Sequence, residues 1–446
     1  MFKISKKISK SLGRAGVLIT PHGEIQTPAF VAVGTKATVK SLSPEQVLDA
    51  GSQVILANTY HLYLEPGEKI IKKAGGLHKY MNWEGPMMTD SGGFQAFSLG
   101  VAYGNNLSKF IGSDAPDKEE IIDAYKENKE KKAKITEDGV EFRSIIDGSK
   151  HFFTPEKSIQ IQNDLGADII FAFDECTSPH ASKKYLEEAM ERTHRWAERC
   201  LVEHKDLGQK KKHSLERTEY FSAEKSPPSR TSRAPKVALE KFSSSDSEQQ
   251  LFDNTHSKNF GSSLFGIVQG GRYEDLRKES AKIIGKMDFD GFGVGGSFVK
   301  EDMATAVKWV NEILPEEKPR HLLGVGEPID LVLGVENGCD TFDCVAATRI
   351  ARNGTFYTKV GKINITNSKY KNFLEPVEGG CNCYACKNYT TAYISHLFRA
   401  KEMFGATLAS IHNIYFLNNL MSQIREAILE DKFFEFKKEF LETYDI

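Results

Sequence analysis

The 446-residue sequence has no long hydrophobic run. Its apolar stretches, such as residues 167–173, are far shorter than the roughly 20 residues that a helix needs to cross a membrane. The basic first ten residues also lack the continuous apolar segment of a secretory signal. The sequence therefore predicts a soluble, cytoplasmic protein with no membrane partner.

An excess of one charge sign is also missing, because 59 Lys and Arg residues oppose 61 Asp and Glu residues. The net charge of −2 argues against a uniformly basic nucleic-acid-binding surface but leaves room for a local basic patch. The seven cysteines, an odd number without a signal peptide, indicate a reducing compartment. With 40% hydrophobic residues the chain can fill a large core, which excludes a wholly disordered protein.

Short apolar runs that end in glycine or a carboxylate alternate with segments of helical period. The apolar runs are residues 54–58, 86–93, 169–175, 264–271, 291–296, 321–326 and 341–345. Buried strands that alternate with helices are typical of a parallel α/β fold. About seven or eight such units favour a (β/α)8 TIM barrel over a doubly wound sheet. In addition, no G-x-G-x-x-G motif opens a first βα turn.

Three cysteines lie within six residues of each other. Cys381, Cys383 and Cys386 follow a Gly-Gly pair, and thiolates at this spacing with one imidazole make the closed ligand set of a structural zinc site. Unmetallated, three such thiols would be reactive. We predict one zinc ion held by these cysteines and His412, with His396 as the alternative fourth ligand.

Residues 205–262 interrupt the barrel pattern and are rich in Ser, Lys, Arg and Glu. Such a composition buries too little surface to offset its ordering entropy, so we expect a disordered insertion. An extra arm that contacts RNA or protein is the alternative. The predicted organisation places the N-terminal part of the barrel at residues 1–204 and its C-terminal part at residues 263–354. An inserted zinc-binding subdomain and C-terminal helices follow at residues 355–446.

Polar side chains stand at the ends of several predicted strands: Asp90, Asp174, Gln269 and Asp343. In a barrel these ends converge on one face, where catalytic groups gather. Three carboxylates in one mouth favour nucleophilic or acid–base chemistry, because desolvation and repulsion separate their pKa values. Each alone could equally be a cap or turn residue, as Asp90 before Ser-Gly-Gly illustrates. Their predicted convergence favours the catalytic interpretation.

Basic residues gather around the predicted zinc site. From Arg349 to Lys401 there are nine Lys and Arg residues against Glu375 and Glu378, a net charge of +7. A basic projection beside an active-site mouth suits a polyanion such as RNA. An ordinary solvated surface explains the composition equally well.

Several ordered motifs resemble the tRNA-guanine transglycosylase family (queuine tRNA-ribosyltransferases). They include Asp-Ser-Gly-Gly-Phe-Gln at 90–95, Phe-Asp-Glu-Cys at 173–176 and Val-Gln-Gly-Gly at 268–271. Further matching segments are residues 27–30, 33–40, 58–62, 324–326, 342–344 and 348–354. The resemblance runs from about residue 4 to the C-terminus, apart from the insertion.

The resemblance implies a zinc-bearing barrel that replaces the wobble guanine of certain tRNAs by a deazaguanine base. Asp343 would be the nucleophile that attacks the ribose anomeric carbon, forming a covalent ribosyl–enzyme that the incoming base then displaces. Asp90 would be the acid–base group that handles the purine proton. A homodimer is implied as well.

The resemblance also implies two sets of binding residues. Contacts with the base are assigned to Ser91, Gly92, Gly93, Phe94, Asp174, Gln269, Gly296 and Leu323. Contacts with the anticodon loop are assigned to Gly324, Val325, Gly326, Glu327, Pro328, Ile329, Asp330, Thr348, Arg349, Ile350, Ala351 and Arg352. Phe94 and Leu323 would sandwich the faces of the base.

Cys176 and Val299 resemble the bacterial subtype, which inserts 7-aminomethyl-7-deazaguanine (preQ1) in queuosine biosynthesis. Bulk at Val299 would narrow the pocket beside the seven-position of the base. Phe94 stands where a tyrosine is frequent and Ala347 where a proline is frequent, and these departures concern fine substrate preference. A queuine-inserting enzyme and a non-catalytic tRNA-binding subunit are the alternatives. The non-catalytic subunits lack the nucleophile, whereas Asp343 is present here.

Overall fold

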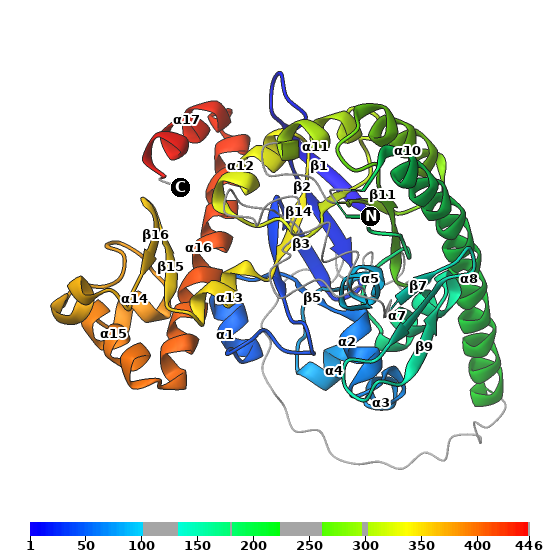
Figure 1. The fold of residues 1–446 in the computed structure, drawn as a ribbon, viewed down its shortest axis with the longest axis horizontal. Coiled ribbons are helices and arrows are strands. Elements are labelled where there is room, and N and C mark those ends of the chain that lie inside the picture. The colour runs from blue at the N-terminus through cyan, green and yellow to red at the C-terminus, as the bar shows by residue number, and fades with distance from the viewer. Residues whose placement is uncertain (101–132, 179–180, 224–260, 297–301, 445–446) are drawn as a thin grey trace, which may run out of the picture.

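The computed structural model describes residues 1–100, 133–178, 181–223, 261–296 and 302–444. Eight parallel strands close into a barrel in the order β10-β11-β12-β13-β14-β4-β5-β6 (Figure 1). The barrel strands are β4 (Ala29–Val33), β5 (Ile55–Ala57), β6 (Met87–Thr89), β10 (Ile169–Phe171), β11 (Ser263–Val268), β12 (Gly291–Val294), β13 (Arg320–Leu322) and β14 (Thr341–Cys344). The barrel strand that comes last in the sequence, β14, pairs with the one that comes first, β4. This pairing places Thr341 opposite Ala29 and closes the barrel. The predicted (β/α)8 fold is confirmed.

Helices surround the barrel and alternate with its strands. In the first half they are α1 (Pro44–Asp49), α2 (Thr59–Leu64), α3 (Glu68–Lys73), α4 (Leu77–Met81), α5 (Gly93–Gly100), α7 (Pro155–Leu165) and α8 (Lys183–Ala223). In the second half they are α10 (Glu274–Lys286), α11 (Met303–Asn311), α12 (Pro328–Glu336) and α13 (Ala346–Ala351). The local sequence sets their ends: Thr154 caps α7 by accepting from the Lys157 amide at 3.2 Å, and Gly166 ends the helix at φ 77°.

Two small antiparallel sheets add to the barrel. One is formed by β1 (Phe2–Lys7), β2 (Arg14–Thr20) and β3 (Gly23–Thr27), and the other by β7 (Ala133–Ile135), β8 (Val140–Arg143) and β9 (Lys150–Phe153). Inside the barrel, the side chains of Val31, Leu56, Met88, Phe171 and Ile267 are buried against one another. The barrel therefore has a packed core, as such barrels do.

The C-terminal segment forms a subdomain beside the barrel. It contains β15 (Thr355–Thr358), β16 (Gly361–Asn364), the 3-10 helix η2 (Ser368–Asn372), α14 (Tyr384–Asn388), α15 (Thr391–Ala400), α16 (Met403–Leu429) and α17 (Phe433–Thr443). Figure 1 shows α16 standing between the barrel and the small orange subdomain. This helix contacts β4 and α13 as well as β15 and α14, so it joins the two parts.

The prediction that residues 205–262 are disordered is wrong for the first part of this segment. Helix α8 continues from Lys183 to Ala223, so residues 205–223 are helical, while residues 224–260 lie outside the described residues. The first half of α8 is anchored by the fully buried Trp196 and packs on α7. Helix propagation from an anchored segment is easy, and the Lys, Glu, Arg and Leu that follow are good helix formers. Composition alone does not show that anchor.

Among the residues that the structure describes, no helix is both long enough and apolar enough to cross a membrane.

Candidate active site and metal centre

The predicted polar residues lie at the carboxyl ends of the barrel strands. Asp90 directly follows β6, Asp174 lies three residues after β10, Gln269 directly follows β11, and Asp343 lies within the last residues of β14. Because all eight strands are parallel, these ends form one rim. Gly296 after β12 and Leu323 after β13 lie on the same rim.

Asp90 is held by three donors. Its Oδ1 accepts from the backbone amide of Thr59 at 2.8 Å, and its Oδ2 accepts from Asn58 Nδ2 at 2.5 Å and from Gln95 Nε2 at 3.0 Å. Burial nevertheless raises the pKa of Asp90, and the negative charge of Asp343 raises it further. The two predicted catalytic carboxylates therefore interact electrostatically across the mouth of the barrel.

Asp343 is oriented by two donors on the neighbouring strand end. Its Oδ1 accepts from His321 Nε2 at 3.0 Å and from the backbone amide of Gly324 at 2.8 Å. The other ring nitrogen of His321, Nδ1, lies 2.9 Å from the hydroxyl of Thr341. A neutral imidazole with its proton on Nε2 satisfies both contacts. His321 is fully buried, while the side chain of Asp343 is 14% exposed at the mouth.

Sequence reasoning assigned no role to His321. A histidine inside an apolar strand has the pattern of a core residue, and its contact with Asp343 depends on the pairing of β13 with β14. The signal that the sequence offered is the position of His321 near the end of a predicted strand, three residues before Gly324.

A buried polar network joins three of the predicted base-binding residues. Gln269 Nε2 donates to Asp174 Oδ2 at 2.6 Å, and the Ser91 hydroxyl donates to Asp174 Oδ1 at 3.2 Å. Gln269 Oε1 is buried and accepts no hydrogen bond from the described residues. A buried acceptor of this kind is costly unless a ligand donates to it. The network can therefore receive a planar, donor-rich heterocycle.

Glycines keep this network accessible. Gly296 has φ 91°, and a Cβ there would lie 2.7 Å from Gln269 Oε1. Gly92 has φ 79°, and a Cβ on Gly93 would lie 2.7 Å from the Asp174 carbonyl oxygen. A side chain at either Gly296 or Gly93 would clash with this polar network, so these positions require glycine. Phe94 and Leu323, the predicted walls, are both half-buried. Val299, predicted to set base preference, lies outside the described residues.

The predicted RNA-binding segments divide into buried and exposed residues. Val325, Pro328, Asp330, Thr348 and Ala351 are buried and support the loops, whereas Arg349 and Arg352 are exposed. Glu327 is half-buried, and its carboxylate forms an ion pair with Lys362 at 2.7 Å. The surface available to RNA in these segments is therefore mainly that of the two arginines.

Two further lysines belong to the same rim. Partial desolvation and the positive charges of Arg352 and Arg349 lower the pKa of Lys40, so the two arginines act on this lysine electrostatically. Lys36 also lowers it. Both lysines occur in residues 33–40, one of the segments that resemble the family, but the motif alone indicates no role for them. We refer to Lys36, Lys40, Arg349 and Arg352 as the basic rim.

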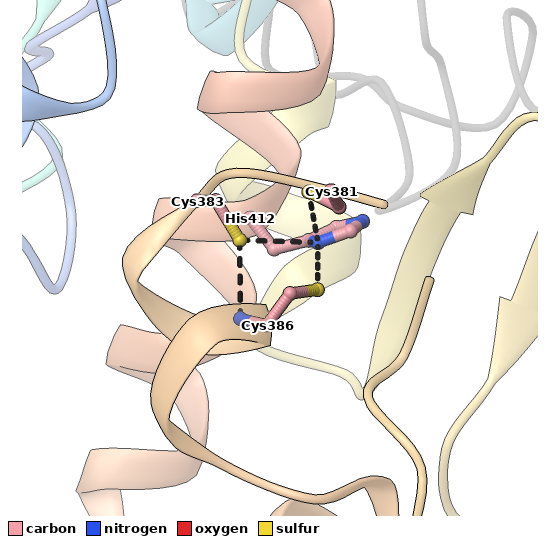
Figure 2. A group of neighbouring side chains, drawn as sticks. All are labelled: Cys381, Cys383, Cys386 and His412. Carbon is pink, nitrogen blue, oxygen red and sulfur yellow. Dashed lines mark hydrogen bonds between the residues drawn. The ribbon is translucent and has the colours of Figure 1, made fainter. Parts of the chain in front are cut away.

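The three cysteines and His412 converge in the subdomain, as Figure 2 shows. The Sγ atoms of Cys381, Cys383 and Cys386 lie 3.9, 3.5 and 3.3 Å from His412 Nδ1. Ligands at about 2.3 Å (sulfur) and 2.0 Å (nitrogen) from a tetrahedral zinc lie roughly 3.5 Å apart, so the group can hold such an ion.

Outer contacts orient the imidazole of His412. Its Nε2 donates to the carbonyl oxygen of Tyr357 at 2.7 Å, which leaves Nδ1 as the lone-pair nitrogen facing the sulfurs. His412 comes from the buried face of α16, whereas His396 on α15 is exposed and lies outside the group. The structure therefore places His412 beside the three cysteines and excludes His396 as the fourth ligand.

Comparison with known proteins agrees with this geometry. A family model described as queuine tRNA-ribosyltransferase matches residues 9–217 and 226–446. The chain belongs to the queuine tRNA-ribosyltransferase family. Curated queuine tRNA-ribosyltransferases similar to it include that of Thermoanaerobacter pseudethanolicus, 46% identical over 446 residues, covering 99% of this chain and 97% of the relative.

Two further relatives carry the same name. The protein of Fusobacterium nucleatum is 43% identical over 449 residues, covering 100% of this chain and 98% of the relative. That of Staphylococcus aureus is 43% identical over 444 residues, covering 99% and 96%. The family resemblance inferred from the motifs is confirmed.

Proposed function

We propose that this queuine tRNA-ribosyltransferase family member exchanges the wobble guanine of tRNA for preQ1 through a covalent ribosyl–aspartate at Asp343. The observation that carries the proposal is the pair of electrostatically coupled carboxylates at one barrel mouth, Asp343 beside His321 and Asp90 beside Thr59. Two such carboxylates match a double displacement at an anomeric carbon.

In the first step, an oxygen of Asp343 attacks C1′ of the ribose and the bond from C1′ to N9 of guanine breaks. The leaving base takes the proton of the Asp90 carboxyl group. The raised pKa of Asp90, due to burial and then to the charge of Asp343, favours the protonated form needed here. The phosphate backbone of the tRNA is untouched.

In the second step, the incoming base gives its N9 proton to the Asp90 carboxylate and its nitrogen attacks C1′, which releases Asp343. While Asp343 is esterified it carries no charge, so one of the influences that raise the pKa of Asp90 is removed. Asp90 is then a carboxylate more readily, as a proton acceptor must be. His321 and Gly324 keep Asp343 aligned in both steps.

The base would be read by the Asp174, Gln269 and Ser91 network, with its faces against Phe94 and Leu323. Asp174 accepts N–H donors, and Gln269 Oε1 is an acceptor left for the ligand. The choice of preQ1 over queuine rests on the resemblance of Cys176 and Val299 to the bacterial subtype.

The tRNA would lie across the basic rim, whose cations neutralise phosphates around the anticodon loop. The Cys381, Cys383, Cys386 and His412 group would hold zinc, which as a closed four-ligand site stabilises the subdomain and takes no part in the reaction. We further propose that the enzyme is a cytoplasmic homodimer.

Incorporation of radiolabelled guanine into purified tRNA by this protein alone tests the proposal. Exchange that is competed by preQ1 more strongly than by queuine supports it. Stronger competition by queuine favours the queuine-inserting alternative, and absence of exchange favours a non-catalytic tRNA-binding subunit.

A further inference from the structure

A second cluster of metal-ligating side chains lies at the opposite end of the barrel. His22 lies in the turn between β2 and β3, His78 lies in α4, and Asp168 directly precedes β10. The reaction site uses the other ends of the same strands, since Asp90 follows β6 and Asp174 follows β10. The proposed base exchange has no use for this cluster.

The three side chains point their polar atoms at one another. His22 Nδ1 lies 2.6 Å from Asp168 Oδ1, and His78 Nε2 lies 3.3 Å from Asp168 Oδ2. The two imidazole rings are stacked, with centroids 3.6 Å apart and an angle of 18° between their planes. The potential ligand atoms all lie within 4.8 Å of one another.

The contact of His78 with Asp168 is the weaker of the two. His78 Nε2 is buried and makes no hydrogen bond with the described residues, despite its proximity to Asp168. The carboxylate of Asp168 is almost fully buried and fixed by the Met87 amide at 2.8 Å. A bound cation would take the place of the long contact between His78 and Asp168 and give the imidazole nitrogen a direct bond.

We propose that His22, His78 and Asp168 form a second divalent-metal site, one that takes Zn²⁺ reversibly. Two imidazoles and a carboxylate are zinc ligands, and ligand atoms around a tetrahedral zinc lie about 3.3 Å apart. The contact of His78 with Asp168 already has this length, whereas that of His22 must lengthen. The side chain of His22 is 42% exposed, so the ion enters from solvent and water completes its coordination.

The ion would connect three separate elements at the base of the barrel: the β2–β3 turn, α4 and the start of β10. Because the site exists only in the folded chain, binding stabilises the native state by mass action. With three protein ligands instead of four, and no thiolate, it holds zinc more weakly than the Cys₃His group does.

The test uses the full chain with its Cys₃His site already loaded with zinc. After equilibrium dialysis against buffered micromolar Zn²⁺, metal analysis should find one ion more per chain than in protein dialysed against zinc-free buffer. His22→Ala, which removes an exposed ligand, should lose that extra ion. Added Zn²⁺ should raise the Tm of the wild type and leave that of His22→Ala unchanged.

Two variants complete the design. His78→Gln removes the buried ligand and should also lose the extra ion, whereas His396→Ala removes an exposed histidine elsewhere and should retain it. If the wild type takes up no extra zinc, or if His22→Ala takes up as much, the cluster is an ion-pair network and the proposal is wrong. Neither outcome depends on base exchange, so the proposed function is tested separately.

Discussion

His321 donates from Nε2 to Oδ1 of Asp343 over 3.0 Å, from a ring that is fully buried on the neighbouring barrel strand. With the Gly324 amide, it holds Oδ1 of the carboxylate that we propose as the nucleophile. Rigid support of this kind maintains a reactive geometry that a loop-borne aspartate would lose.

Replacing this imidazole should slow the reaction without removing the nucleophile. We expect His321→Asn to reduce kcat by about 100-fold with little change in KM for tRNA, because a misplaced reactive group loses roughly that factor. Steady-state guanine exchange measures both constants, and Tm monitors the fold. An unchanged kcat in a folded variant would show that His321 only fills the core.

The pH dependence should report Asp90. Burial, the largest cause of the raised pKa of Asp90, remains when Asp343 is esterified. As the pH falls, the carboxylate form of Asp90 should therefore be lost at a higher pH than that of an ordinary aspartate, whose pKa is about 3.9. The base-uptake step needs that carboxylate, so kcat/KM for the base should fall on the acid side with a midpoint above 3.9. A rate profile from pH 4 to 8 measures this limb.

Asp90→Asn is the matched control for that profile. It keeps the size of the side chain and removes the titration, so the residual rate should be far lower and should show no acid limb. An identical limb in Asp90→Asn would assign the titration to another group.

The basic rim should govern tRNA binding. Lys40→Ala and Arg352→Ala should each raise KM for tRNA roughly 3- to 10-fold and reduce the slope of log affinity against log salt by about 1. Their KM for the free base should not change. Lys282→Ala, an exposed lysine on α10, is the control. Equal salt slopes in all variants would place the RNA elsewhere.

Loss of zinc from the Cys₃His group should destabilise the folded protein. Cys383→Ser should lower the zinc content and reduce Tm by about 5–10 °C, because structural zinc contributes directly to folding. His396→Ala should keep both, since that side chain is exposed and outside the ligand group. Full zinc content in Cys383→Ser would contradict the ligand set.

Much of the site could be predicted because short apolar runs that alternate with helical segments indicate a parallel barrel. Once β6, β10, β11 and β14 are recognised as buried parallel strands, the residues after them must share one rim, which places Asp90, Asp174 and Gln269 together. The three cysteines are equally evident, because their spacing is local. The fourth ligand required the structure, since only the packing of α16 distinguishes His412 from His396.

Other features depend on contacts between distant segments. The basic rim joins Lys40 with Arg349 and Arg352, about 300 residues apart in sequence, and no local pattern reports that proximity. His321 acts through a neighbouring strand. The continuation of α8 past residue 205 depends on the anchoring of its first half, which composition does not record.

The covalent intermediate is the central claim, and trapping it is the most direct test. Wild-type protein incubated with tRNA, then denatured and separated by electrophoresis, should show an enzyme–RNA adduct that resists denaturation. The adduct should be absent in Asp343→Ala, which retains the other residues of the mouth. An adduct of equal yield in Asp343→Ala would contradict the assignment of Asp343 as the nucleophile.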